Sequence, residues 1–427
     1  MSPLGRYDLL WRMARPVLPL VLHRRAARGK EDRSRIAERL GRLDARSDLP
    51  DNPVWIHAVS VGESVAAMAL AASMRARDDG LPILMTTNTV TSAARVAAQA
   101  ADTGLTHLYQ PLDHPDMVAS FLRRVRPRLA LFLESDFWPN LVIRTAQAGI
   151  PVAFVSAQLS DRAFSRWQKQ SGLASALFGT ASLILAVDDR QAERFITLGA
   201  DRQRVRVGGS LKLPGAGRPT RPDLVSMLKD ASGSRKVLLA ASTHEGEDAT
   251  VIEAARQLGE GWFTIIAPRH PERGSDIAAL CAGQGLTARR RGGGAAAAKD
   301  DTLYIADTLG EMDSLFSVAD IVFLGGSLKP LGGHNPVEPA AHGLPILTGP
   351  HVFKNEAEFS GLRKAGVVTD VADAQDLAFC ARNIAEDAVW RERIAAAARD
   401  YAAETGKRSE IAADSCLELI GTSTTPS

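Results

Sequence analysis

The chain has 427 residues, more than one domain usually holds, and this length predicts two domains. Hydrophobic residues make up 45% and charged residues 23%, which excludes a disordered chain and a polytopic membrane protein. The net charge is only +2, but residues 1–50 carry twelve Lys/Arg against six Asp/Glu. Three widely spaced cysteines exclude a disulfide framework and a Cys-x-x-Cys zinc pair, so we expect a reducing, cytoplasmic setting: Cys281, Cys380 and Cys416.

The N-terminus combines an apolar stretch with a basic one. Tyr7–Leu22 is apolar but shorter than the ~20 residues of a spanning helix. It is also interrupted by four residues: Arg12, Arg15, Pro16 and Pro19. No small-residue cleavage site follows, which argues against a signal peptide. A basic cluster at His23–Lys30 and a charged helix at Ser34–Arg42 come next, so we expect residues 1–42 to lie on an anionic membrane surface. The alternative is an ordinary helix that packs on its own domain.

From residue 53 onward, short apolar runs alternate with alanine-rich helical stretches. This alternation predicts a parallel sheet covered by helices on both faces. The expected strands of the first half are Val54–Ser60, Ile83–Thr87, Leu129–Glu134, Val152–Ser156, Leu183–Val187 and Val205–Val207. The helices expected between them include Ser64–Arg77, Thr91–Ala101 and Pro115–Arg124.

The pattern stops near Lys212 and restarts after a segment rich in Pro and Gly. The strands expected in the second half are Val237–Ala241, Phe263–Ala267, Leu303–Ala306, Ile321–Leu324, Pro345–Thr348 and Val367–Thr369. Arg289–Asp301 reads as a mobile surface loop, and Asp387–Glu404 as a last helix. The predicted division is an N-terminal segment (1–50), a first Rossmann-like domain (51–212), a linker (213–222), a second Rossmann-like domain (223–420) and a tail (421–427).

In a parallel sheet, ligands bind beyond the carboxyl ends of the strands, so residues that follow strands are the candidates for chemistry. Ser60-Val-Gly-Glu63 follows the first strand and either caps a helix or supplies Glu63 as a general base. Glu134 ends another buried strand, where an acid is costly unless it is paired or used. A second helix cap is the alternative interpretation of Glu134.

Three segments of the second half also follow strands. Ser242 and Thr243 are small hydroxyl residues at a helix start, where they can donate to an anion. Pro268-Arg269 follows the next strand, and Arg269 can grip a phosphate or carboxylate, although a lone loop arginine is more often a surface charge. Asp307–Met312 follows the third strand.

The segment Gly325–Pro339 is the densest candidate. Its four glycines permit close approach of the backbone to a phosphate, and they stand among Ser327, His334, Asn335 and Glu338. Asn335 is expected to open a helix whose N-terminus receives negative charge, and Glu338 to accept ribose hydroxyls. A long turn is the alternative, but such a sequence is costly to order without a ligand. We therefore expect this segment to hold a nucleotide-activated sugar.

Several other site types are excluded by spacing. The chain has no P-loop and no dinucleotide fingerprint after a strand. The loops of His244, His270 and His334 lack the spacing of a zinc site, and there is no Gly-x-Ser-x-Gly elbow of an α/β-hydrolase. Basic charge gathers only at the N-terminus with few aromatic residues, so we expect no nucleic-acid partner.

Taken together, these segments resemble the 3-deoxy-D-manno-octulosonic acid (Kdo) transferases of lipopolysaccharide synthesis, which have a GT-B fold. The resemblance covers almost the whole chain. It is carried by HAVSVGES (57–64), ESDFWPNLV (134–142), GGSLK (208–212), STHEGE (242–247), APRHPER (267–273), DTLGEM (307–312) and GGSLKPLGGHNPVEPAAHGLPILTGP (325–350). It implies two Rossmann-like doubly wound domains facing a cleft, with an N-terminal membrane-associating helix.

The resemblance also implies the reaction and its residues. Kdo would pass from CMP-Kdo to the lipid A precursor (lipid IVA), with inversion and without a metal or other cofactor, on the cytoplasmic side of the bacterial inner membrane. Glu63 corresponds to the catalytic base, Glu134 to a second carboxylate and Lys212 to a charged residue at the interdomain cleft. The segments that correspond to CMP-binding segments comprise Pro268, Arg269, Gly310, Glu311, Met312, Asn335, Pro336, Val337 and Glu338.

The chain departs from the family pattern on the acceptor side. Ser156-Ala-Gln158 stands where Asn-Ala-Arg is common, Ser210 where Asn is common, and Ser135-Asp136 where Thr-Glu is common. These departures leave open the acceptor's details and the number of sugars added. The alternative functions are a GT-B enzyme or epimerase that uses a UDP-sugar, and a non-catalytic nucleotide- or lipid-binding protein.

Overall fold

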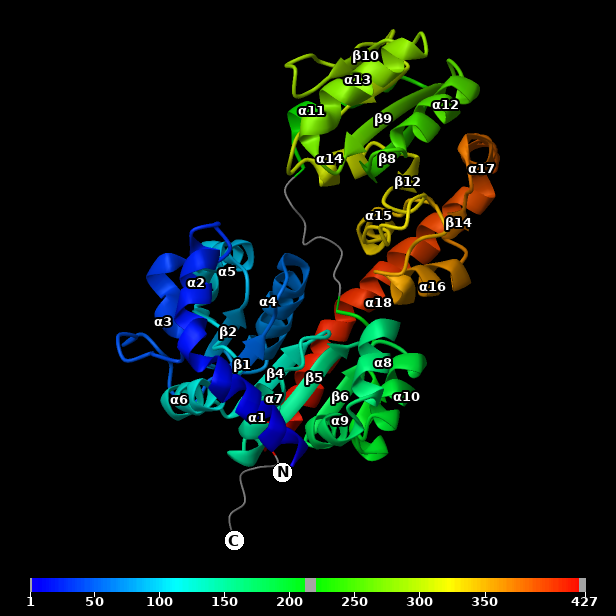
Figure 1. The fold of residues 1–427 in the computed structure, drawn as a ribbon. Helices are drawn as coiled ribbons and strands as arrows, with labels where there is room; N and C mark the ends of the chain where they lie inside the picture. Colours follow the sequence, from blue (N-terminus) through cyan, green and yellow to red (C-terminus); the bar gives the residue numbers. More distant parts are fainter. Residues whose placement is uncertain (1, 212–219, 422–427) are drawn as a thin grey trace. The chain divides into compact units, whose positions relative to one another are not determined.

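A computed structural model describes residues 2–211 and 220–421. The chain forms two compact units, one of residues Met1–Lys212 with Lys407–Ser427 and the other of Leu213–Gly406. Each unit contains one seven-stranded sheet with helices on both of its faces (Figure 1). All strand pairs in both sheets are parallel.

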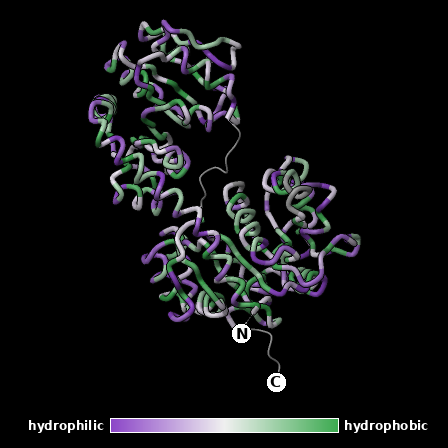
Figure 2. Tube along the Cα trace, turned by 180° about the vertical axis from the view of Figure 1, so that it is seen from behind, coloured by the Kyte–Doolittle hydropathy of each residue, from purple (hydrophilic) through white to green (hydrophobic). Residues whose placement is uncertain are grey.

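The sheet of the first unit has the strand order β3-β2-β1-β4-β5-β6-β7. Its strands are β1 (Val54–His57), β2 (Ile83–Thr87), β3 (Thr106–Tyr109), β4 (Leu129–Leu133), β5 (Val152–Ala157), β6 (Leu183–Ala186) and β7 (Val205–Val207). Alternate residues along a strand enter opposite cores: Trp55 and Phe132 face one core, whereas Ile56 and Leu131 face the other. Burial on both faces explains why these strands read as continuous apolar runs, which Figure 2 shows as hydrophobic segments of the trace.

The helices that connect these strands cover both faces of the first sheet. They are α4 (Val61–Arg75), α5 (Val90–Thr103), α6 (Pro115–Val125), α7 (Pro139–Gln147), α8 (Asp161–Gln168), α9 (Ser171–Phe178), α10 (Asp189–Thr197) and the short η3 (Arg202–Arg204). The strand β3 was not expected, because Thr106 and His107 interrupt the apolar pattern near the edge of the sheet.

The N-terminal helices pack on the first unit. They are α1 (Pro3–Ala14), η1 (Arg15–Val17), α2 (Leu18–Ala26), η2 (Arg33–Arg35) and α3 (Ile36–Arg39). The Tyr7 hydroxyl donates to Asp113 Oδ2 at 2.9 Å, and Arg144 Nη2 lies 2.6 Å from Asp8 Oδ2. The charged helix expected over Ser34–Arg42 is present but shorter, as the 3-10 turn η2 followed by the single turn α3. Glu38 is buried and accepts hydrogen bonds from Arg35, Arg46 and the Tyr109 amide, so this segment is a packed connection.

The sheet of the second unit has the order β10-β11-β9-β8-β12-β13-β14. Its strands are β8 (Lys236–Thr243), β9 (Trp262–Pro268), β10 (Ala288–Arg290), β11 (Leu303–Ile305), β12 (Ile321–Leu324), β13 (Ile346–Thr348) and β14 (Val368–Asp370). Its helices are α11 (Pro222–Ser232), α12 (Asp248–Leu258), η4 (Pro271–Arg273), α13 (Gly274–Gly283), α14 (Met312–Phe316), α15 (Val337–Ala341), α16 (Glu356–Lys364), α17 (Ala374–Glu386) and α18 (Ala388–Gly421).

The mobile loop expected over Arg289–Asp301 is wrong in its first part, where β10 adds an edge strand to the sheet. Three successive arginines each pair with a buried carboxylate. Arg289 Nε lies 3.0 Å from Asp301, Arg290 Nη2 lies 2.8 Å from Asp307, and Arg291 Nε lies 2.5 Å from Glu311. The run of charges reads as solvated in the sequence because its partners lie 12 to 20 residues further along the chain.

The last helix also differs from its expected end at Glu404. Helix α18 continues through Thr405-Gly406 to Gly421, since Thr405 is buried and its hydroxyl donates to the Tyr401 carbonyl oxygen at 2.9 Å. Residues from Lys407 onward belong to the first unit, where Ala412, Ala413 and Cys416 enter one of its cores. The expected second domain, which ran to residue 420, therefore ends earlier.

Candidate functional site

Each sheet has one point where the strand order reverses direction. In the first sheet this switch point lies between β1 and β4, and in the second between β8 and β12. The connections that follow the two strands leave toward opposite faces there, which opens a crevice at the carboxyl ends. The Ser60–Glu63 and Glu134 motifs flank the first switch point. The 242–247 and Gly325–Pro339 motifs flank the second.

Glu63 takes part in a capping box at the start of α4. The Glu63 amide donates to Ser60 Oγ at 3.2 Å, and Glu63 Oε2 accepts from the Val59 amide at 2.8 Å. The Glu63 amide belongs to the first helical turn, whose donors have no partner within the helix, whereas the Val59 amide lies just before the N-cap residue Ser60. The capping interpretation therefore holds, and it fixes the Glu63 carboxylate at the switch point, half-exposed.

Glu134 directly follows β4 and has a strained backbone conformation. Its φ is +56°, a left-handed value that is uncommon for a residue other than glycine. Ser156, at the corresponding end of the neighbouring β5, has φ +55°. Gln158 Nε2 donates to Glu134 Oε2 at 3.2 Å, so a residue at one of the family departures contacts this carboxylate. Strain of this kind clusters at functional sites because a turn needed for function overrides local preference.

A hydrogen-bonded chain supports the same edge of the first sheet. The fully buried His57 bridges Thr86 Oγ1 at 2.8 Å and Asp136 Oδ2 at 2.9 Å. Trp138 Nε1 and Asn88 Nδ2 also donate to Asp136 Oδ2, at 2.8 and 3.2 Å. These contacts fix the turn that follows Glu134. The sequence alone predicts no role for His57 or Asp136, although both lie inside motifs that carry the family resemblance.

In the second unit, the buried Glu247 holds the glycine-rich segment to the end of β8. Glu247 Oε2 accepts from the amides of His244 and Gly326, and Oε1 accepts from those of Ser327 and Leu328, all within 2.7–2.9 Å. A carboxylate with four amide donors is well compensated for its loss of water. The sequence alone predicts no role for Glu247, although this residue ends the motif STHEGE (242–247).

The carboxyl ends of β8 and β12 approach each other closely. A Cβ at Gly325 would lie 2.6 Å from the Ser242 carbonyl oxygen, so only glycine fits there. Ser242 itself has φ +56°. Thr243 Oγ1 is buried and has no hydrogen-bond partner among the described residues, while the Arg269 amide donates to the Thr243 carbonyl oxygen at 3.0 Å. Pro268 is buried at the end of β9, and the Arg269 side chain is exposed beside this edge.

His244 and His334 meet at the same place. Their Nε2 atoms lie 2.9 Å apart, and the His270 ring makes an edge contact with His244. Burial, together with the nearby charges of His244, Arg269, Lys354 and His270, lowers the pKa of His334 to about 4. The pKa of His244 is also lowered, mainly by burial. Both imidazoles are therefore neutral at pH 7 in a cationic surrounding.

The 307–312 turn is held by ion pairs. Glu311 is buried and accepts from Arg291 Nη2 at 2.7 Å, from Arg221 Nη1 at 2.9 Å and from the Thr308 hydroxyl. Burial alone would raise the pKa of Glu311, but the hydrogen bonds from Arg291 and Thr308 hold it below its usual value. Gly310 has φ +81°, and Met312 starts α14 half-buried. The Glu311 side chain thus stabilises the turn.

Asn335–Glu338 form the entry to α15, as expected. Asn335 Oδ1 accepts from the Val337 amide at 3.1 Å, Pro336 precedes the helix, and Glu338 lies half-buried in its first turn. Ser327 differs from its expected role. It is fully buried, its hydroxyl donates to the Leu324 carbonyl oxygen and accepts from the Gly349 amide, and it therefore belongs to the fold rather than to a ligand. Lys212 lies outside the described residues.

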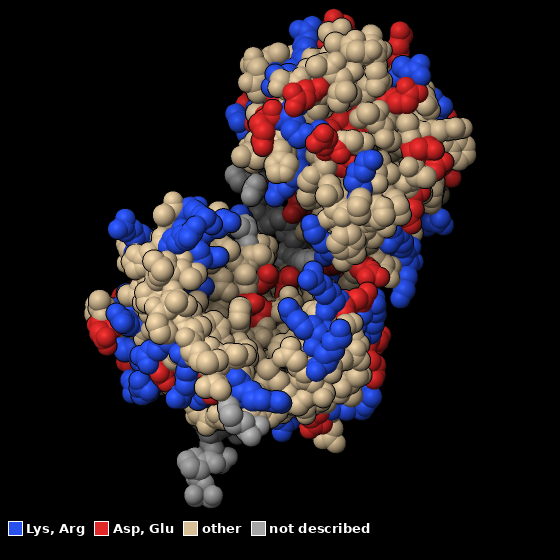
Figure 3. All heavy atoms as spheres, in the orientation of Figure 1, with Lys and Arg blue, Asp and Glu red and all other residues tan. Residues whose placement is uncertain are grey.

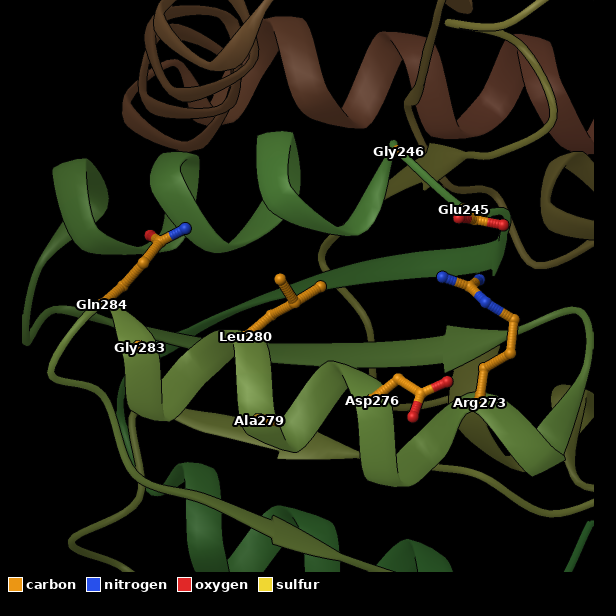
Figure 4. Close-up of a pocket in the computed structure, with 8 residues that line it drawn as sticks. All are labelled: Glu245, Gly246, Arg273, Asp276, Ala279, Leu280, Gly283 and Gln284. Carbon is orange, nitrogen blue, oxygen red and sulfur yellow. The ribbon is translucent and has the colours of Figure 1, made fainter.

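A separate open cavity of about 740 Å³ lies between α12 and α13 (Figure 4). The side chains of Arg273, which precedes α13, of Leu280 within it and of Gln284, which follows it, point toward α12, while Glu245 and Gly246 close one end. The cavity lies beside the helices rather than at the ends of the strands. No residue of Gly325–Pro339 is among those that line it, so it is not the candidate site.

Comparison with known proteins places these features in a family. Residues 34–214 match the family model described as 3-deoxy-D-manno-octulosonic-acid transferase (kdotransferase). The 3-deoxy-D-manno-octulosonic acid transferase of Haemophilus influenzae is 31% identical over 377 residues, which cover 87% of each chain. That of Bordetella pertussis is 34% identical over 432 aligned residues, covering 98% of this chain and 99% of the relative.

Solved structures match the fold over most of the chain. A glycosyltransferase from Rickettsia africae covers 87% of this chain and 100% of its own, with a TM-score of 0.62 at 12% identity. The UDP-GlcNAc 2-epimerase from Neisseria meningitidis covers 86% of this chain and 100% of its own, with a TM-score of 0.60 at 13% identity. At these identities the likeness establishes the fold alone, and it confirms the GT-B class predicted from the sequence.

Proposed function

The chain belongs to the 3-deoxy-D-manno-octulosonic-acid transferase family and is a glycosyltransferase of lipopolysaccharide biosynthesis; from this premise we propose that it moves Kdo from CMP-Kdo to the lipid A precursor lipid IVA. The observation that carries the proposal is the charge at the two switch points. The first unit presents the carboxylates Glu63 and Glu134. The second presents Arg269 beside a glycine-rich loop and neutral histidines.

We assign the donor to the second unit. The leaving CMP develops negative charge on its phosphate, which a guanidinium and backbone amides stabilise in a site that excludes water. Arg269 has an exposed side chain on a backbone fixed to Thr243, so it can reach such a phosphate. Gly310–Met312 and Asn335–Glu338 would hold the nucleoside.

We assign the acceptor chemistry to the first unit. The bond to CMP breaks through an oxocarbenium-like state, and the acceptor hydroxyl attacks from the opposite face, so the anomeric centre inverts. Glu63 takes the proton of that hydroxyl as general base. Glu134, set at a strained strand end and touched by Gln158, would orient the acceptor. No residue in this scheme needs a metal, and we expect full activity in EDTA.

The N-terminal helices would hold the enzyme on the cytoplasmic face of the inner membrane. Exposed apolar side chains lie on α1, η1 and α2: Leu9, Leu10, Met13, Val17, Leu20 and Val21. Lys and Arg side chains gather on the first unit in the region of α2 (Figure 3). Among the helices of the described residues, none is both long and apolar enough to cross a bilayer.

The proposal is tested with purified enzyme, CMP-Kdo and lipid IVA. Mass spectrometry of the product should show added Kdo and will give the number of sugars, and NMR should show an inverted anomeric centre. CMP should compete with the donor, whereas UDP should not. A product without Kdo would refute the proposed acceptor or the proposed donor. Retention of the anomeric configuration would refute the role of Glu63 as general base in a single displacement.

A further inference from the structure

The rings of His244 and His334 meet edge to edge. They are nearly parallel, at 7°, with centroids 5.2 Å apart, yet the facing Nε2 atoms are only 2.9 Å apart. The nitrogens therefore lie between the two centroids, as in an in-plane hydrogen bond, and the rings are not stacked face to face. Such a bond requires one Nε2 to carry a proton and the other to accept it, so the two neutral rings are opposite tautomers.

This geometry sets the number of protons that the pair can hold. One further proton, placed on Nδ1 of the donating ring, turns that ring into an imidazolium and makes the bond charge-assisted and stronger. A second added proton would place two N–H donors face to face and break the bond. The pair therefore has room for one additional charge while the link between the end of β8 and the glycine-rich loop is kept.

Without a ligand, the neighbouring cationic side chains disfavour protonation of the pair. Arg269, His270 and Arg273 act on the pair from the segment after β9, and Lys354 acts from the loop after β13. Glu247, the N-cap residue of α12, is an anion that acts on His244, and its carboxylate is already shared among four backbone amides. An anionic ligand beside Arg269 would reverse this balance, since its charge favours an imidazolium.

We propose that His244 and His334 act as one proton-sharing pair that takes up a single proton when the anionic nucleotide binds, and so supplies a second cation to the donor phosphate. The inference rests on the proposed donor site. Binding raises the pKa of the pair above its ligand-free value. By linkage, nucleotide affinity is then greatest at low pH and falls as pH rises through the pKa of the bound state.

The test measures CMP binding by calorimetry at pH 7.5 in buffers of different ionisation enthalpy, with cytidine as the ligand that lacks the phosphate. The wild type should take up close to one proton with CMP and none with cytidine. Its affinity for CMP should fall by up to about tenfold per pH unit above neutrality, the slope of a one-proton linkage. His244→Gln keeps a side-chain donor near His334 but shares no titratable proton, and it should lose both the uptake and the slope.

His334→Gln repeats the test from the other ring, and His342→Gln is the control, since His342 contacts Asp313 away from the pair. Melting temperatures verify that each variant is folded. CMP binding without proton uptake, or equal uptake in both pair variants and the wild type, would refute the proton-sharing role of the pair. Neither result would contradict the proposed donor site. Absence of CMP binding to the wild type would overturn both.

Discussion

Glu63 illustrates how one side chain serves the fold and the reaction together. Its carboxylate caps α4 and stands at the switch point of the first sheet. Replacement by alanine removes both roles, whereas glutamine can still accept from the Val59 amide and complete a capping box. The glutamine variant therefore distinguishes the loss of a general base from the loss of a helix cap, because it removes only the base.

We predict that Glu63→Gln lowers kcat by roughly 10²–10⁴-fold, the usual contribution of a general base. The free energy of unfolding should change by less than about 1 kcal/mol, because the cap is kept. Steady-state assays and denaturant unfolding measure the two effects. Ser60→Ala is the converse control, which should lose stability while kcat changes far less. Activity of Glu63→Gln close to that of the wild type would rule out the base.

A second residue-scale prediction concerns Glu247. In Glu247→Gln an amide N–H₂ must face two backbone N–H donors, which leaves buried donors without acceptors. The loss should be about 1–3 kcal/mol in the free energy of unfolding, together with weaker CMP binding. Chemical denaturation and calorimetry measure these effects. The exposed neighbour provides the control, since Glu245→Gln should alter neither quantity.

At the scale of elements, one of the contacts that hold the N-terminal helix is to a buried acid. Asp113 accepts from the amides of Asn140 and Leu141 at the start of α7 and from the Tyr7 hydroxyl of α1. Burial raises the pKa of Asp113 to about 7, although the amide donors of Asn140 and Leu141 oppose the shift. Helix α1 therefore docks through a polar contact that is buried on the first unit, while its exposed apolar side chains remain free for another surface.

Tyr7→Phe should detach α1 in part. It removes one donor from a buried carboxyl group, and we expect a loss of about 1–3 kcal/mol in local stability. Hydrogen exchange in residues 3–14 should quicken, with little change in the strands. Arg15→Ala breaks an exposed ion pair with Asp116 and should cost less than about 1 kcal/mol. Equal exchange rates in Tyr7→Phe and the wild type would contradict the docking role.

At the scale of the whole molecule, the question is what the exposed apolar face of the N-terminal helices contacts. Leu10 and Leu20 are 62% and 71% exposed, near a basic cluster, which is the pattern of a segment that lies in a lipid interface. The packing of α1 on its own unit and contact with a membrane are compatible, since they use different side chains.

We predict that the double variant Leu10→Ser/Leu20→Ser binds vesicles containing anionic lipid at least about tenfold more weakly than the wild type, because burying a leucine contributes up to about 1.5–3 kcal/mol. Wild-type binding should also weaken with salt. Vesicle flotation measures both effects. The matched control is Phe379→Ser/Val389→Ser, which removes two exposed apolar side chains from α17 and α18 of the other unit. Equal loss in the control would show non-specific adsorption.

The sequence by itself determined the class of fold and the order of the site segments, because buried parallel strands must be apolar and ligand loops must follow their carboxyl ends. The strands β2, β7 and β12 have the bounds expected from the apolar runs of the sequence. Motifs also located Glu63, Arg269 and the glycine-rich segment.

Only the tertiary structure decided which polar groups support these motifs. Distant residues are joined by His57–Asp136, by Glu247 with the amides of Gly326, Ser327 and Leu328, by the His244–His334 pair and by the three arginines of β10 and its end. The physical reason is that a buried charge or imidazole is tolerated through partners that folding brings together. No local pattern of residues records where those partners will lie.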